Sequence, residues 1–136
     1  MEDLKNLIIL NLKDLDIHKT KFKTEKEFEN YIYLNLENLI KKFDNNVLVK
    51  RQIINTKESR QLKPDIIIGL NDILIELKYD IENLNDIYRL FYQAFKYSKL
   101  AKQLLIFYLY DPRKEMTSED IRDLESFEKV KVIRKL

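Results

Sequence analysis

The residues best suited to chemistry stand at the ends of one predicted hairpin. Asp65 opens an isoleucine-rich run, and Glu76 and Lys78 close the next one. Between the runs, the sequence Gly-Leu-Asn-Asp at 69–72 contains the protein's only glycine and is typical of a tight turn. Core packing does not explain why two acids and an amine stand at the ends of otherwise apolar strands.

A symmetric turn through Gly69–Asp72 places Asp65 directly opposite Glu76. Opposed side chains in an antiparallel pair have Cβ atoms roughly 4.5–5.5 Å apart. Two carboxylates at about 4 Å repel by up to roughly 4 kcal/mol in an effective dielectric near 20, and a bound cation is the simplest means of offsetting this. Because side chains alternate along a strand, Lys78 lies on the same face as Glu76. The predicted cluster is therefore two acids and one amine around a cation.

A long helix is predicted before the hairpin. Thr24 and Glu27 form a capping box, and the helix runs to about Phe43. At 100° per residue, Glu25 falls in the middle of the apolar stripe and Glu29 falls on its flank. Glu25 is therefore predicted to be an inward-facing acid, although acids in a first turn also complement the helix dipole. The stripe consists of Phe28, Ile32, Leu36, Leu39, Ile40 and Phe43.

Another helix is predicted after the hairpin, from about Ile81 to Lys102. Gln93 and Tyr97 are four residues apart and lie on one side of it, at the edge of the buried face. The alternative interpretation is that Tyr97 is a half-buried packing residue and Gln93 has no role. The buried face consists of Ile87, Leu90, Phe91, Ala94, Ser98 and Ala101, and the more exposed sides carry Lys96, Lys99 and Lys102.

A polar connection at 55–63 leads into the acidic cluster. Such a run is usually a solvated loop, but its position also permits contact with phosphate. The basic residues in and beside it are Lys50, Arg51, Lys57, Arg60 and Lys63.

Composition limits the classes of protein to consider. The chain has 136 residues, enough for one domain, and no cysteine, which fits a cytoplasmic location. It has no apolar run near the roughly 18 residues of a membrane span. Charged residues make up 35%, but the net charge is only +2, too balanced to indicate nucleic-acid binding by itself. An amphipathic helix at 3–15 is predicted either to pack on the domain or to form a dimer contact.

The order of predicted elements indicates the fold class. Two helices are followed by three strands, the first of them at 47–54, then by helix, strand, helix and strand. Antiparallel hairpins followed by β-α-β alternation predict a single α/β domain with a mixed sheet and helices on both faces.

These residues together resemble the PD-(D/E)xK nuclease superfamily. The matching elements are the acid Glu25, then Pro64-Asp65, then Glu76-Leu77-Lys78, then Gln93-x-x-x-Tyr97. The last element is similar to the branch that contains RecB-type exonuclease domains and archaeal endonucleases acting on branched or mismatched DNA. The resemblance covers residues 24–110, the expected nuclease core, and leaves 1–20 as an N-terminal helical extension. Holliday-junction resolvases share the first three elements, but their acid would align with Glu29.

The resemblance implies a restriction-endonuclease-like fold and a metal-dependent deoxyribonuclease. Asp65 and Glu76 would hold Mg²⁺ or Mn²⁺ together with the Leu77 carbonyl, and Glu25 would act through a water or a second ion. Lys78 would position the attacking water or neutralise the phosphate.

Gln93 and Tyr97 would orient the metal site or a phosphate, and the products would carry 5′-phosphate and 3′-hydroxyl ends. Restriction, repair and junction-resolving roles stay open within this interpretation. Outside it, the alternatives are a catalytically silent module that binds nucleic acid or a protein, and a structural domain without a site. A homodimer is possible through 4–15 or the aromatic residues near Tyr88, Tyr92 and Phe95.

Overall fold

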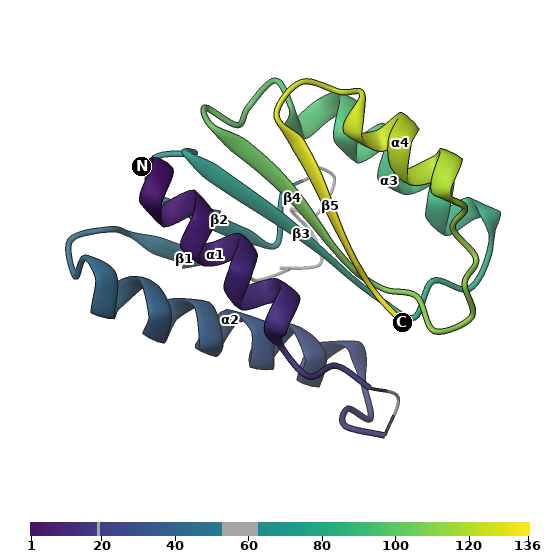
Figure 1. Cartoon of the computed structure of the whole chain (residues 1–136), viewed down its shortest axis with the longest axis horizontal. Coiled ribbons are helices and arrows are strands. Elements are labelled where there is room, and N and C mark those ends of the chain that lie inside the picture. Colours follow the sequence, from purple (N-terminus) through teal and green to yellow (C-terminus); the bar gives the residue numbers. More distant parts are fainter. Residues whose placement is uncertain (19, 53–62) are drawn as a thin grey trace, which may run out of the picture.

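The element order agrees with the sequence prediction. The structure is a computed structural model that describes residues 1–18, 20–52 and 63–136 (Figure 1). The elements are α1 (Glu2–Asp14), α2 (Glu25–Phe43), β1 (Val49–Arg51), β2 (Ile66–Ile68), β3 (Ile73–Tyr79), α3 (Leu84–Tyr97), β4 (Leu104–Tyr110), α4 (Ser118–Glu125) and β5 (Val130–Lys135).

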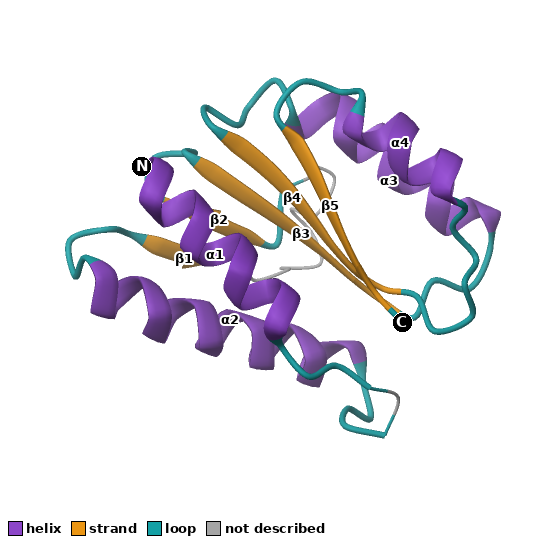
Figure 2. Ribbon diagram, viewed as in Figure 1, coloured by secondary structure: helices purple, strands orange, loops and turns teal. Residues whose placement is uncertain are grey.

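The described strands form one mixed sheet, which confirms the α/β class. The strand order is β1-β2-β3-β4-β5, antiparallel from β1 to β3 and parallel from β3 to β5. Because both parallel crossovers step in the same direction and such crossovers are right-handed, α3 and α4 lie on one face. Figure 2 shows α1 and α2 covering the other face.

Each face of the sheet has its own apolar core. Ile73, Ile75 and Leu77 of β3 pack with α1 and α2, whereas Leu74 packs with α3 and α4. Since side chains alternate along the strand, Glu76 and Lys78 belong to the α3 side. The two charged residues therefore occupy positions that otherwise fill the second core.

The hairpin has the predicted register. Ile66 pairs with Ile75, Ile67 with Leu74, and Ile68 with Ile73. Continuing this register by one residue places Asp65 opposite Glu76. The turn depends on left-handed backbone at Gly69, with φ 68°, and at Asn71, with φ 62°.

Two predicted boundaries are corrected. The helix predicted at 81–102 spans Leu84–Tyr97, because the Asn83 side chain accepts a hydrogen bond from the Asp86 amide and so caps its start. The predicted strand from Val47 begins at Val49, and residues 53 and 54 lie outside the described chain. Helix α2 begins as predicted, with the Thr24 hydroxyl accepting from the Glu27 amide at 3.2 Å. The predicted capping box is only half formed, because the Glu27 carboxylate accepts from the Lys23 amide at 2.6 Å.

Helix α1 packs on the domain. Leu4, Ile8 and Leu12 are buried in the core beneath α1 and α2. The Tyr108 hydroxyl donates to the Leu12 carbonyl at 2.8 Å, and the Lys135 ammonium donates to the Lys13 carbonyl at 2.6 Å. These contacts account for the apolar stripe of the N-terminal helix through intramolecular packing.

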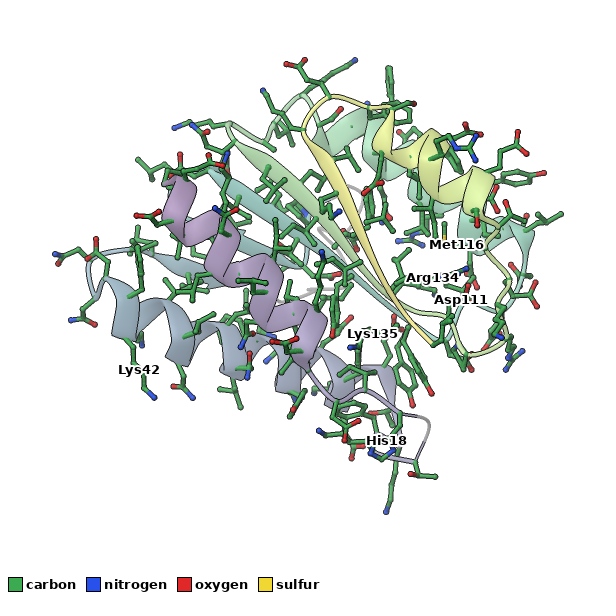
Figure 3. All side chains as sticks on the ribbon, viewed as in Figure 1. His18, Lys42, Asp111, Met116, Arg134 and Lys135 are labelled. Carbon is green, nitrogen blue, oxygen red and sulfur yellow. The ribbon has the colours of Figure 1, made fainter. Side chains whose placement is uncertain are left out.

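A buried acid organises the loop after β4. Asp111 is fully buried, and its two carboxylate oxygens accept the amides of Glu115 and Met116 at 2.9 and 3.0 Å. Arg134 lies 3.7 Å from the same carboxylate, and Figure 3 shows the three labelled side chains Asp111, Met116 and Arg134 close together. This acid has a structural role.

Across the described residues, none of the helices is both long and apolar enough to cross a membrane.

Replacing Gly69 by alanine is expected to lower the free energy of unfolding by about 1–2 kcal/mol, because an L-residue is strained in left-handed backbone. The added Cβ would also collide with the carboxylate of Asp72, which must rotate away. Urea denaturation measures the loss. Asn71→Gly is the matched control, since glycine relieves the same backbone strain and should leave the stability equal or higher; equal losses in both variants would contradict the prediction.

Candidate functional site

Asp65 and Glu76 form a pair of carboxyl groups at the end of the β2–β3 hairpin. Glu76 is only 7% exposed, and Asp65 is half-buried. The two groups share a hydrogen bond, and burial raises the pKa of both. The charge of Asp65 raises the pKa of Glu76 further, well above its ordinary value. The free protein therefore favours a proton held between the two acids.

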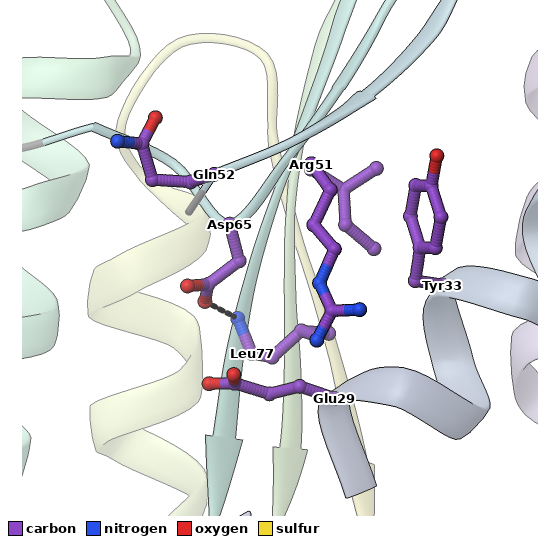
Figure 4. A pocket seen from close by; sticks show the side chains of 7 residues that line it. Glu29, Tyr33, Arg51, Gln52, Asp65 and Leu77 are labelled. Atoms are coloured by element: carbon purple, nitrogen blue, oxygen red, sulfur yellow. Dashed lines mark hydrogen bonds between the residues drawn. The ribbon is translucent and has the colours of Figure 1, made fainter. Parts of the chain in front are cut away.

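The backbone holds Asp65 in place (Figure 4). Its Oδ2 accepts a hydrogen bond from the amide of Leu77 on β3 at 2.8 Å, and its carbonyl accepts from the amide of Gln52 at 2.9 Å. The side chain thus satisfies a strand amide just where the described β2–β3 pairing ends at Ile66. The Asp65 carboxylate therefore takes part both in the backbone pairing of the hairpin and in the pair with Glu76.

Two buried oxygens at the pair lack a partner among the described residues. They are Oε2 of Glu76 and the hydroxyl of Tyr97. Burial raises the pKa of Tyr97, and the charges of Glu76 and Asp65 raise it further. A buried polar atom without a hydrogen bond costs about 1–3 kcal/mol, so these oxygens are suited to a ligand that satisfies them.

The acid that α2 brings to the pair is Glu29. Burial raises the pKa of Glu29 to about 7, with further contributions from the charges of Asp65 and Glu25. Glu25, the predicted inward acid, is exposed at the first turn of α2. The angle of Glu25 around the helix matches that of the buried residues, but the angle does not give the position along the axis. Glu25 stands at the exposed start of the helix, three residues before the first buried position, Phe28.

A cavity adjoins the acids on the α2 side. It has a volume of about 720 Å³ and is lined by Thr24, Glu25, Lys26, Glu29, Arg51, Gln52 and Asp65. A second hollow of about 10 Å³, the room of one water molecule, lies among Glu29, Tyr33, Arg51, Asp65 and Leu77 (Figure 4). The guanidinium of Arg51 lies 5.5 Å from the ring centre of Tyr33. Glu25 thus lies on the rim of the cavity that Asp65 and Glu29 also line.

Lys78 lies on the same strand face as Glu76 but is paired elsewhere. Its ammonium is 3.5 Å from the carboxylate of Asp86 near the start of α3. Asp86 also accepts a hydrogen bond from the Glu82 amide at 2.9 Å. Asp86 was not predicted from the sequence, because an acid in a first turn is explained by the helix dipole alone.

Helix α3 turns a polar line toward the acids. Gln93 and Tyr97 are both buried, deeper than the edge position predicted from the sequence. Arg89 lies one turn before Gln93, and its positive charge lowers the pKa of Asp65, Glu76 and Tyr97. Arg89 was not predicted from the sequence, although its spacing of four residues from Gln93, which is itself four from Tyr97, was a visible signal.

The predicted phosphate-binding residues do not all share one face. Lys50 is exposed, and Arg51, its neighbour on β1, is half-buried against α2, since consecutive strand residues point to opposite faces. Lys63 is exposed. Lys57 and Arg60 lie outside the described residues.

The acids fit a hard divalent cation as a pair rather than as a cage. No three Asp, Glu, His or Cys side chains in the described chain gather closely enough to hold a metal ion between them. Asp65 and Glu76 nevertheless offer carboxylate oxygens, one of them buried and unpartnered. Mg²⁺ is commonly bound by one or two carboxylates with water in its other positions. The ligand role of the Leu77 carbonyl stays a prediction.

Comparison with known proteins finds no relative of this chain. The chain matches no protein-family model, no curated protein and no solved structure.

The raised pKa of Glu29 makes stability depend on pH. Between pH 4.5 and about 7, folded Glu29 keeps a proton that the unfolded chain has lost. The free energy of unfolding is therefore expected to fall as pH rises through this window in protein kept metal-free with EDTA. The raised pKa values of Asp65 and Glu76 act with the same sign.

Urea denaturation across this window should give a shallower fall for Glu29→Gln than for the natural chain. Glu119→Gln, which changes an exposed acid on α4, should keep the natural slope. Identical slopes in the natural chain and Glu29→Gln would contradict the assignment.

Proposed function

We propose that the chain is a metal-dependent nuclease that hydrolyses phosphodiester bonds in DNA on a restriction-endonuclease-like core. The observation that carries the proposal is the opposed pair Asp65–Glu76, two carboxyl groups with raised pKa values beside a cavity. Like charges this close are unfavourable without a cation, and divalent cations of the Mg²⁺ type take oxygen ligands. The resemblance of the surrounding residues to PD-(D/E)xK nucleases supplies the reaction class.

Asp65 and Glu76 would hold Mg²⁺ or Mn²⁺, with the Leu77 carbonyl and water as further ligands. Glu29 would reach the same site through water, and Glu25 would do so from the rim of the cavity. The bound cation would supply a water of lowered pKa and positive charge for the phosphate. Because the cation must displace the proton between Asp65 and Glu76, its binding is expected to strengthen as the pH rises.

The remaining groups would act on the phosphate. Lys78 is half-exposed, and its ion pair with Asp86 at 3.5 Å is of a kind worth about 0–1 kcal/mol, so it can exchange for a phosphate. Arg89 would bring a second cation to the developing charge. Gln93 and Tyr97, buried behind the carboxylates, would fix the position of Glu76.

Hydrolysis would add water across the phosphorus–O3′ bond and leave 5′-phosphate and 3′-hydroxyl ends. Two branches of the superfamily remain relevant to this chain. The buried Gln93 and Tyr97 favour the Gln-x-x-x-Tyr branch. The closeness of Glu29 to Asp65 is similar to the acid position expected in junction resolvases.

The decisive experiment is a cleavage panel. Single-stranded, duplex, flapped, mismatched and four-way DNA are each incubated with Mg²⁺, Mn²⁺ or EDTA, and the product ends are mapped. Cleavage of at least one substrate with either metal and none with EDTA is expected. Absence of cleavage from the whole panel, together with no heat of metal binding by calorimetry, would favour a catalytically silent binding module.

Asp65→Asn and Glu76→Gln are expected to lower the cleavage rate at least about a hundredfold, the upper end of what loss of an outer metal contact costs. Both substitutions keep the side-chain shape, and Asp65→Asn keeps an oxygen for the Leu77 amide. Their melting temperatures should therefore equal or exceed that of the natural chain, because an amide can donate a hydrogen bond to the remaining carboxylate and one buried acid is removed.

Arg89→Ala should lower the same rate about 10- to 100-fold without abolishing metal binding. Lys42→Ala, on the distant end of α2 in Figure 3, is the matched control for loss of a positive charge and should leave the rate unchanged. Full activity in Asp65→Asn would refute the proposed site.

A further inference from the structure

The outer side of α3 carries a line of exposed rings that the core does not explain. Tyr88, Tyr92 and Phe95 are 63%, 51% and 48% exposed. Their spacing of four and three residues places them on one side of the helix. We call these three residues the aromatic stripe. Exposed single apolar residues are ordinary, but three aligned rings on one helix form a surface that suits a partner.

Positive charge accompanies the aromatic stripe. The ammonium of Lys99 lies 3.8 Å from the ring centre of Phe95, and that of Lys96 lies 5.8 Å from the ring centre of Tyr92. Between Leu84 and Lys102 the only acid is Asp86, which is engaged with Lys78. The basic residues in that interval are Arg89, Lys96, Lys99 and Lys102. The chain as a whole is nearly neutral, so this concentration is local.

Rings with adjoining ammonium groups match one class of partner. Single-stranded nucleic acid presents flat bases that stack on aromatic side chains and phosphates that attract lysine. Four and three residues along a helix correspond to about 6 and 4.5 Å. Both exceed the roughly 3.4 Å between stacked nucleotides of one strand in a duplex. Bases that follow the stripe must therefore be drawn apart, which a single strand permits and a duplex does not.

A second copy of the chain fits this surface poorly. In a two-fold dimer the same patch meets itself, so Lys96 and Lys99 would face Lys96 and Lys99 of the other copy. Lysine is depleted in protein interfaces for this reason of charge and hydration. No acid on this side of α3 is available to compensate. A polyanion satisfies the lysines and the rings together.

The aromatic stripe also leads to the acids. Around the helix, Lys96 and Arg89 lie between Tyr92 and Gln93, at about 100° per residue. Basic groups thus join the stripe to the side of α3 that faces Asp65 and Glu76. A strand stacked on the rings would have phosphates directed toward the carboxylate pair.

We propose that the aromatic stripe binds single-stranded DNA and guides it to the carboxylate pair. This inference rests on the proposed nuclease function and names its substrate as a single strand or the single-stranded arm of a branched DNA. Binding itself needs no metal ion, so it can be measured apart from cleavage.

The test is fluorescence anisotropy of the full chain in EDTA, with labelled oligothymidylate and with a blunt duplex of the same length. The natural chain should bind oligothymidylate more tightly than the duplex. Tyr88→Ala and Tyr92→Ala should each weaken the binding of oligothymidylate about tenfold, the usual effect of losing one stacking ring. Tyr88→Phe and Tyr92→Phe keep the rings and should bind within about twofold of the natural chain, since stacking needs only the ring.

Lys96→Ala and Lys99→Ala should each reduce the salt dependence of binding by about one counterion. Leu34→Ala, an exposed apolar residue on α2, is the control for general loss of apolar surface and should change neither affinity nor salt dependence. Asp65→Asn should bind oligothymidylate at least as tightly as the natural chain, because it removes a negative charge from the place to which the phosphates lead.

Natural affinity in the alanine variants, or equal affinity of the natural chain for duplex, would overturn the inference. A dimer in sedimentation that the alanine variants convert to a monomer would overturn it as well and assign the stripe to a second copy. If the stripe variants lose binding while the natural chain cleaves no DNA, the stripe is supported and the nuclease function fails. If the stripe variants cleave DNA and bind oligothymidylate normally while Asp65→Asn is inactive, the nuclease function is supported and the proposed role of the aromatic stripe is refuted.

Discussion

The repulsion between two opposed carboxyl groups is the constraint on which the site depends. A hairpin register fixed by Ile66–Ile75 pairing forces Asp65 and Glu76 together, and the register cannot slip by one residue without turning every side chain to the other face. The apolar residues that hold the register in place are buried in both cores. The folding energy of the cores therefore maintains a pair of acids that would separate if they were free.

The topology brings the other groups to this pair from both layers. Glu29 comes from α2 on one face, and Arg89, Gln93 and Tyr97 come from α3 on the other. The pair can meet both because Asp65 stands before β2, where the described ladder has ended. Within the sheet, side chains of one face are hidden from the other. At the end of a short strand this separation is lost, and acids from opposite layers can approach one point.

The parts of this arrangement that the sequence predicts are those with a fixed geometric period. The tight turn at Gly69 gives the register, and the register gives the opposition of Asp65 and Glu76 without reference to any other element. Choosing between Glu25 and Glu29 requires the position of α2 along its axis, which depends on packing against the sheet. Arg89 and Asp86 were not predicted, because each has an ordinary explanation as a residue of an isolated helix. Their relation to Glu76 and Lys78 exists only once α3 is placed across β3.

The hydrogen bond from the Leu77 amide to Asp65 links the strand ladder to the charge of the site. An amide so placed exchanges its hydrogen with solvent only when the carboxylate swings away. A proton or a cation that binds this carboxylate changes how often its hydrogen bond with the Leu77 amide breaks. The exchange rate of the Leu77 amide hydrogen therefore reports what is bound to Asp65. Hydrogen exchange can measure this rate in the unmodified chain and without a substrate.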